Sequence, residues 1–348
     1  MSRSLLTTLT FLLTAMSAYS ADVSGYAQTT LQTNATDPQL IDPWGVSFSA
    51  TSPFWVSDAG SGVSTLYNSA GVKQGLVVSM PVGSFSVTGQ VFSGTANFNG
   101  DNFLFATNEG TITGWRSALG TTAETLFTQT GADFTGLAIA TSKTAIYGAD
   151  FATGKIDVFG SGGLTGSFSD PNVPAGYAPF NVQNINGTIY VTFAKVGNNG
   201  RAAPGVGNGY VAIFNPTTGT FTSLISNGVL NDPWGITVAP AVGFGALSGD
   251  LLVGNFGDGS INAFDPTTGA FIGTLADQSG NPIADSGLWA ITFGNGGSGG
   301  VTTSLYVAAG TDNETGGLFA RIDAVPEPST WALGLGGLAL LLGLRRRG

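Results

Sequence analysis

The chain has 348 residues, with 21 acidic against 11 basic residues, a net charge of −10, and neither Cys nor His. Without Cys it has no disulfides or thiolate metal sites, and without His it lacks Ser-His-Asp hydrolysis and zinc chemistry of the usual kind; its acidic balance disfavours nucleic acid. Only 9% of the residues are charged and 54 are Gly, a composition typical of an all-β protein with many tight turns.

The N-terminus has the three parts of a secretory signal peptide. Arg3 is followed by an apolar stretch over residues 5–15, and Ala18-Tyr19-Ser20 forms a small-x-small cleavage site. We therefore predict a signal peptide at residues 1–20 and export of the protein. The alternative is a buried N-terminal helix.

The sequence between the two ends is repetitive. The motif DPWG stands at residues 42–45 and again at 232–235, and six similar units open near residues 43, 88, 134, 180, 233 and 288. Each unit has an apolar strand, a second strand followed by a Gly-rich turn, and a third strand that contains an aromatic residue near its end. A period of about 45–55 residues with several short strands per unit indicates the blades of a β-propeller.

The fourth strand of each unit predicts how the ring closes. Units one to five carry a fourth strand, unit six does not, and a spare strand at residues 25–33 precedes unit one. We predict an all-β, six-bladed β-propeller over residues 22–323, closed by this N-terminal strand in the last blade, which leaves no exposed sheet edge. Two separate three-repeat domains would explain neither the missing strand nor the spare one.

The loops that enter the first strands and the turns between the second and third strands are predicted to share one face of the propeller, because successive strands alternate in direction. This face is where we expect a ligand to bind. The candidate ligand-binding residues on it are Asp42, Trp44, Asp58, Asp232, Trp234, Asn255, Asp258 and Trp289.

Two interpretations of these residues stay open. The Asp and Asn side chains either cap the Gly-rich turns by accepting backbone N–H bonds, or converge on the channel and hold Ca²⁺ through oxygen ligands. Their repetition in several units favours the structural role, since a site needs unique residues. The Trp side chains either pack in the core between blades or form a stacking platform for sugar rings.

The C-terminus predicts a membrane anchor. Residues 329–344 carry no charge, and Arg345, Arg346 and Arg347 follow them and would hold this end in the cytoplasm. The precursor is therefore expected to contact the membrane through this helix, with the rest of the chain outside.

The same segment has a more specific resemblance. Pro326-Glu327-Pro328, the apolar stretch and the arginine cluster stand in the order of the PEP-CTERM sorting tail of Gram-negative bacteria, which residues 325–348 resemble. The resemblance implies recognition by an exosortase-type processing enzyme, removal of the transmembrane helix, and release to the cell surface or extracellular matrix. The tail is also labelled an ice-binding protein C-terminal domain, and that label implies nothing about ice.

The repeat units resemble NHL-type propellers in their Gly-marked opening and Asp-Gly turn. They lack the basic turn residues of better-known NHL repeats, so the resemblance implies neither the RNA nor the peptide partners of those proteins. The whole arrangement is similar to a family of propellers with PEP-CTERM tails.

The sequence leaves three functions open. The leading hypothesis is a non-enzymatic surface- or matrix-associated module that binds exopolysaccharide or a surface protein, and it assigns no catalytic residue. The second is a Ca²⁺-dependent hydrolase or lyase that uses the channel, with Asp or Glu as its base. The third is a structural envelope protein without a ligand. The sorting tail, the absence of His and Cys, and the repeated polar residues favour the first.

Overall fold

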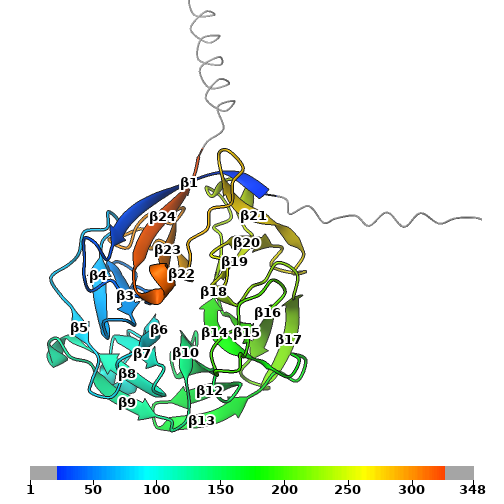
Figure 1. Ribbon diagram of the computed structural model, residues 1–348. Coiled ribbons are helices and arrows are strands. Elements are labelled where there is room, and N and C mark those ends of the chain that lie inside the picture. The colour runs from blue at the N-terminus through cyan, green and yellow to red at the C-terminus, as the bar shows by residue number, and fades with distance from the viewer. Residues whose placement is uncertain (1–21, 326–348) are drawn as a thin grey trace, which may run out of the picture.

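The computed structural model describes residues 22–325, whose strands form sheets set side by side around a common centre (Figure 1). Within these residues four sheets have four strands each, every one continuous in sequence, and a fifth sheet has eight strands. This is an all-β, propeller-like fold, as the repeat pattern predicts.

The strands of the four-stranded sheets follow one another in chain order. The first sheet contains β2 (Pro43–Ser47), β3 (Phe54–Asp58), β4 (Val63–Tyr67) and β5 (Val78–Ser79). The second contains β6 (Val87–Phe92), β7 (Phe103–Thr107), β8 (Thr111–Trp115) and β9 (Glu124–Thr128). The third contains β10 (Phe134–Ile139), β11 (Ala145–Asp150), β12 (Lys155–Gly160) and β13 (Gly163–Phe168). The fourth contains β14 (Tyr177–Ile185), β15 (Thr188–Lys195), β16 (Gly209–Asn215) and β17 (Thr220–Ser226).

The eight-stranded sheet joins the two ends of the described chain. One half contains β18 (Pro233–Val238), β19 (Leu251–Asn255), β20 (Ile261–Phe264) and β21 (Phe271–Asp277). The other contains β22 (Leu288–Phe293), β23 (Leu305–Ala309), β24 (Leu318–Ala324) and β1 (Asp22–Thr33). β1 pairs antiparallel with β24 and parallel with the end of β21, as its position beside both strands in Figure 1 shows. The predicted pairing of the N-terminal strand with the C-terminal group of strands is confirmed.

The helical segments of the described chain are short. They are the 3₁₀ turns η1 (Phe98–Gly100), η2 (Ser117–Leu119) and η3 (Gly245–Leu247), and α1 (Thr311–Glu314). No helix within residues 22–325 is long and apolar enough to cross a membrane. The predicted signal peptide (1–20) and transmembrane helix (329–344) lie outside the described residues.

The core lies between neighbouring sheets. The inner and middle strands are buried on both faces, as in β3 and β4. The outer strands β9 and β13 instead contain several solvent-exposed positions. Aromatic rings bridge adjacent sheets: Trp55 of β3 stacks on Phe103 of β7 at 3.9 Å between ring centroids. The apolar runs of the inner strands therefore fill the space between sheets, which is how a propeller buries both faces of a blade.

Close approach between inner strands depends on the glycine of the DPWG motif. A Cβ on Gly45 would lie 2.5 Å from the Thr88 oxygen on β6, and a Cβ on Gly235 would lie 2.5 Å from the Trp289 oxygen on β22. Both separations are too short for any other residue, so glycine is needed where each inner strand meets the next one.

Candidate ligand-binding face

The two DPWG motifs open the inner strands β2 and β18. Pro43 pairs with Asp58 and Pro233 pairs with Asn255, so the end of the second strand of each sheet lies beside the start of the first. We call this end of the ring the DPWG face: it consists of the loops that enter the six inner strands and the turns that follow the second strands.

All six inner strands are irregular next to this face, where their pairing with the second strand shifts register. Such bulges re-aim a side chain relative to the regular strand. Apart from glycines, the buried residues in these irregular stretches are Trp44, Thr88, Thr135, Phe180, Trp234, Trp289 and Ala290. The bulges thus bring three tryptophans and a phenylalanine from four different inner strands to one end of the channel.

These rings form a stack at the centre of the DPWG face. Trp44 stacks on Trp289 at 3.5 Å between centroids, and Phe256 also stacks on Trp289, at 4.2 Å. The side chain of Trp289 is only 1% exposed. The indole of Trp289 is part of the core and offers no free face to a sugar.

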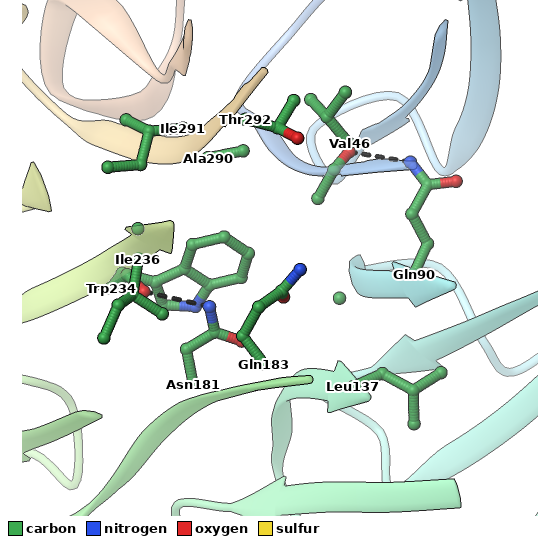
Figure 2. A pocket seen from close by; sticks show the side chains of 13 residues that line it. Val46, Gln90, Leu137, Asn181, Gln183, Trp234, Ile236, Ala290, Ile291 and Thr292 are labelled. Carbon is green, nitrogen blue, oxygen red and sulfur yellow. Dashed lines mark hydrogen bonds between the residues drawn. The ribbon is translucent and has the colours of Figure 1, made fainter. Parts of the chain in front are cut away.

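Trp234 separates this stack from the channel below it. Its indole N–H donates to the Thr135 oxygen at 3.0 Å, and its own carbonyl accepts from the Asn181 side chain at 2.9 Å. The cavity beneath is lined by all six inner strands, and Figure 2 shows the amides of Gln90 and Asn181 bonded to backbone carbonyls there. With about 20 Å³ it has room for about one water molecule.

Asp42 holds two of the tryptophans. Its carboxylate oxygens accept the indole N–H groups of Trp44 and Trp289, each at 2.8 Å. Burial raises the pKa of Asp42 to about 7, although these two hydrogen bonds oppose the rise. Its φ of +48° places it in the left-handed region, which Asp tolerates better than most residues. Asp42 is thus a support beneath the face, and it links the first and last inner strands.

Asp232 has the same place in the second motif and a different environment. Its φ is +47° and its side chain is fully buried, but neither carboxylate oxygen has a hydrogen-bond partner within residues 22–325. Burial raises the pKa of Asp232 to about 7, and the charge of Lys195 and its nearby backbone N–H, which lies outside hydrogen-bonding geometry, only partly oppose the rise. An unpartnered buried carboxylate costs free energy, so this residue does not stabilise the fold as Asp42 does.

The remaining candidate residues lie in turns. Asp58 is buried and accepts from the Thr65 hydroxyl at 2.6 Å, and burial raises its pKa well above the usual value. Asn255 accepts the backbone N–H of Asn231 and donates to the Val229 oxygen. Asp258 is exposed and accepts the backbone N–H and hydroxyl of Ser260. The Asn255 amide also donates to the Asp258 carboxylate at 3.4 Å, so these two side chains meet, whereas Asp58 belongs to a different sheet. These contacts are those of local turn caps.

A cavity of about 280 Å³ opens above the aromatic stack, and we call it the first cavity. Its floor is aromatic and contains Trp44, Phe151, Phe180, Phe256 and Trp289. Apart from Ala202 its wall is polar and contains Ser86, Asn108, Asp133, Thr135, Asn199, Arg201 and Glu314. An apolar floor with a few convergent polar groups is the usual composition of a small-molecule site.

Arg201 is the basic residue of the first cavity. It lies in the Gly-rich loop between β15 and β16, and its guanidinium has neither a hydrogen bond nor an ion pair within the described part of the chain. Opposite charge is nearby: burial raises the pKa values of Asp42 and Asp133, and the charge of Arg201 opposes part of each rise. The carboxylate of Asp133 also accepts from Asn108 at 2.6 Å.

A second cavity of about 290 Å³ adjoins the first and shares Phe256 and Glu314 with it. Glu314 ends α1, where Asp312, Asn313 and Glu314 have φ values of +54°, +56° and +66°. Successive left-handed residues other than Gly are rare and cost about 1–2 kcal/mol each. Strain of this kind is found where a loop must hold a side chain in place for function.

The structure groups some of the predicted residues and separates others. Trp44 and Trp289 line the first cavity, Asp42 lies beneath it, and Trp234 lies between it and the channel. Sequence reasoning did not single out Phe256, Asp133, Arg201 and Glu314. The long Gly-rich insert around Gly200 was a signal for Arg201, since an insertion in one unit alone marks a loop that is free to form a site.

Calcium stays a prediction. No three Asp or Glu side chains within residues 22–325 are grouped so that they could hold a metal ion together. The carboxylate of Asp58 accepts from Thr65, and that of Asp258 accepts from Asn231 and Ser260.

Comparison with known proteins bears on the tail and on the fold. Residues 324–347 match the PEP-CTERM protein-sorting motif, and this match includes Pro326-Glu327-Pro328 and Arg345 to Arg347. Among solved structures the chain is similar to a streptogramin B lyase (11% identity, TM-score 0.55, 86% of this chain and 98% of that one). It is also similar to a structural genomics protein of unknown function from Bacteroides thetaiotaomicron (12% identity, TM-score 0.55, 86% and 76%). At these identities the likeness shows the propeller-like fold alone.

Two relatives are similar in sequence over most of their length. The uncharacterised protein R648 of Acanthamoeba polyphaga mimivirus is 36% identical over 288 residues, which cover 74% of this chain and 70% of the relative. The uncharacterised protein L690 of the same virus is 31% identical over 317 residues, which cover 82% and 81%. The chain therefore belongs to the family of these two proteins, here joined to a PEP-CTERM sorting motif.

Proposed function

We propose that this protein is an exported binding module, which attaches to exopolysaccharide or to a surface protein through the first cavity of the DPWG face. The sorting motif suggests an exported precursor that is anchored in the membrane and processed by an exosortase-type enzyme. A signal peptide at residues 1–20 would start this route, and release to the cell surface or matrix would end it.

We infer that the propeller has six blades. In this interpretation each half of the eight-stranded sheet is one blade, and β1 supplies the outer strand of the last blade. The parallel contact between β1 and β21 then lies between two blades rather than within one. Six inner strands line the central cavity, which supports this count.

One observation carries the proposed function: the first cavity combines an aromatic floor with a guanidinium that has no partner. Arg201 is exposed to solvent and has no acceptor within residues 22–325, so its N–H groups are free to meet a ligand in place of water. A bound ligand would supply the acceptor. The aromatic floor would exclude water from the other side of that ligand.

The proposal can be tested by filling the first cavity. The full-length protein, purified in a mild detergent, is added to envelope and matrix preparations from producing cells that lack the gene. Ser86→Trp and Asn199→Trp place a bulky ring in the cavity and should abolish retention, whereas Thr267→Trp, in an exposed turn at the opposite end of the ring, should not change it.

Equal thermal unfolding of the three variants would show that they are folded. If both cavity variants were retained as well as the unaltered protein, the binding function of this face would be wrong. If neither the unaltered protein nor any variant were retained, the binding function would be wrong, and the role of a structural envelope protein without a ligand would remain.

A further inference from the structure

Phe256 is the one ring of the central stack that presents a face to the cavities. Trp44 and Trp289 are buried, whereas Phe256 is partly exposed and lines both cavities. One face of Phe256 rests on Trp289, and Phe180 meets it edge to face at 6.2 Å. Such a supported ring can pack against a flat apolar surface of a ligand at little cost in ordering, because it is already held.

The polar groups around Phe256 include both donors and acceptors. Arg201 and Asn199 offer N–H groups, and Glu314 offers a carboxylate. A sugar hydroxyl both donates and accepts, so it can satisfy both kinds of group at once. The faces of sugar rings are lined with C–H groups, which suit an aromatic platform.

The charges favour a neutral ligand over an anionic one. The positive charge of Arg201 is matched by Glu314 within the same cavity, and Asp133 adds a further acidic group. The chain as a whole carries −10, so a polymer of uronic acids would be repelled as it approached. A neutral polymer avoids this repulsion and still uses every polar group of the two cavities.

The two cavities together require an extended ligand. Each has about 280–290 Å³, close to the lower limit of about 300–1,000 Å³ for sites that hold one small molecule. They meet at Phe256 and Glu314, so a ligand that fills both must pass over this ridge. A chain of linked sugar units has this shape, with one unit in each cavity.

We propose that the two cavities are neighbouring subsites for a neutral polysaccharide chain, which packs on Phe256 and is hydrogen-bonded by Arg201 and Glu314. This inference rests on the proposed function and names its ligand. The strained turn of α1 then has a purpose, since it holds Glu314 between the two subsites.

The test is an array that carries neutral hexose oligosaccharides and uronate-containing oligosaccharides, each in a series of increasing length. The full-length protein should bind neutral oligosaccharides of two or more units better than single sugars. Arg201→Met and Glu314→Gln should each weaken binding by about tenfold or more, as expected for loss of a hydrogen bond to a charged group. Phe256→Leu keeps an apolar side chain on Trp289 but removes the flat face, and should weaken binding similarly.

Matched variants control for charge and folding. Lys155→Met removes an exposed positive charge elsewhere, and Asp312→Asn removes a negative charge from the same turn as Glu314, outside both cavities. Both should bind like the unaltered protein. Binding restricted to uronate oligosaccharides, equal binding of single sugars and longer chains, or unchanged binding by the three cavity variants would each overturn the inference.

The array also separates this inference from the proposed function. If Ser86→Trp abolishes retention on envelope preparations but no glycan is bound, the first cavity binds a surface protein and the polysaccharide inference is wrong. If Ser86→Trp has no effect on retention, the proposed function itself fails.

Discussion

The two DPWG motifs have the same sequence and the same backbone, yet their aspartates differ in what they contact. Asp42 accepts two indole N–H groups, whereas Asp232 has no partner for either oxygen within residues 22–325. Both have φ near +47°, both pair through the following Pro, and burial raises the pKa of both to about 7. The motif therefore fixes the path of the backbone but not the hydrogen bonds that its aspartate makes.

The difference comes from the neighbouring inner strand. β22 lies next to β2 as β14 lies next to β18, and the bulged residue is Trp289 on β22 but Phe180 on β14. Phenylalanine has no N–H to donate. In addition, the indole N–H of Trp44 donates to Asp42 of its own motif, while the indole N–H of Trp234 donates across the channel to the Thr135 oxygen. Asp232 thus loses both of the donors that Asp42 has.

The largest expected effect is the contrast between Asp42→Ala and Asp232→Ala. Asp42→Ala leaves two buried indole N–H groups without an acceptor and should lower the free energy of unfolding by about 4 kcal/mol, at about 1–3 kcal/mol for each donor. At pH 4, where the carboxyl group of Asp232 is protonated in the folded protein, Asp232→Ala removes no hydrogen bond and should cost about 1 kcal/mol, from the left-handed backbone alone. Urea denaturation at pH 4 measures both. Equal losses would show that the two aspartates have the same role.

The two glycines should behave alike, because the backbone of the motifs is the same. Gly45→Ala and Gly235→Ala each drive a Cβ to 2.5 Å from a carbonyl oxygen of the next inner strand. We expect each to lower the free energy of unfolding by about 2–3 kcal/mol, as overpacking does. Gly162→Ala, whose Cβ would meet nothing within 4 Å, is the control and should change stability little. A large difference between Gly45→Ala and Gly235→Ala would mean that the motifs are not equivalent in backbone.

Trp289→Phe makes the surroundings of Asp42 resemble those of Asp232. It removes one of the two N–H donors and should lower the free energy of unfolding by about 2 kcal/mol, the usual value for a hydrogen bond to a charged group. In this background Asp42→Ala should cost less than in the unaltered protein, since one donor is already gone. Trp234→Phe removes a bond to a neutral oxygen and should cost only about 1 kcal/mol. Additive losses for Trp289→Phe and Asp42→Ala would contradict the coupling.

The sequence predicts the fold well because its repeats carry the pattern of the strands. The unit openings, the missing fourth strand of the last unit and the spare strand before the first are visible in the chain, and the pairing of β1 with β24 follows from them. The bulges are less visible, although they decide which side chains meet at the DPWG face. Nothing in the four letters DPWG shows that Trp44 and Trp234 point their N–H groups to different sides of the ring.

The site depends on contacts between units, and the sequence does not list such contacts. Phe256 follows the second strand of its unit, Arg201 lies in a loop of another, and Glu314 ends a turn of a third. Each is ordinary in its own unit, and only the closure of the ring brings them to one place. Repetition drew attention to Asp58 and Asn255, whereas Arg201 and Glu314 each occur in one unit alone.

The last comparison concerns the pH dependence of stability, which Asp232→Asn should reduce. The pKa of Asp232 is raised to about 7 in the folded protein and has its ordinary value of 3.8 when unfolded. Between these values the folded protein binds more protons, so this residue makes the free energy of unfolding fall as pH rises from about 4 to about 7. Asn does not titrate, and it tolerates the left-handed backbone.

The variant and the unaltered protein should therefore be similar in stability near pH 4. Above pH 4 the free energy of unfolding of Asp232→Asn should exceed that of the unaltered protein, by an amount that grows by roughly 1 kcal/mol per pH unit up to about pH 7. The difference between the two proteins isolates this residue, because carboxylates with lowered pKa values, such as Asp37, change stability in the opposite direction in both. Asp42→Asn should lose the same pH dependence but begin from a lower stability, since Asn can accept only one of the two indole N–H groups through its oxygen. A stability gap that stays constant from pH 4 to pH 7 would mean that Asp232 has a donor after all, and the two motifs would then differ less than their contacts indicate.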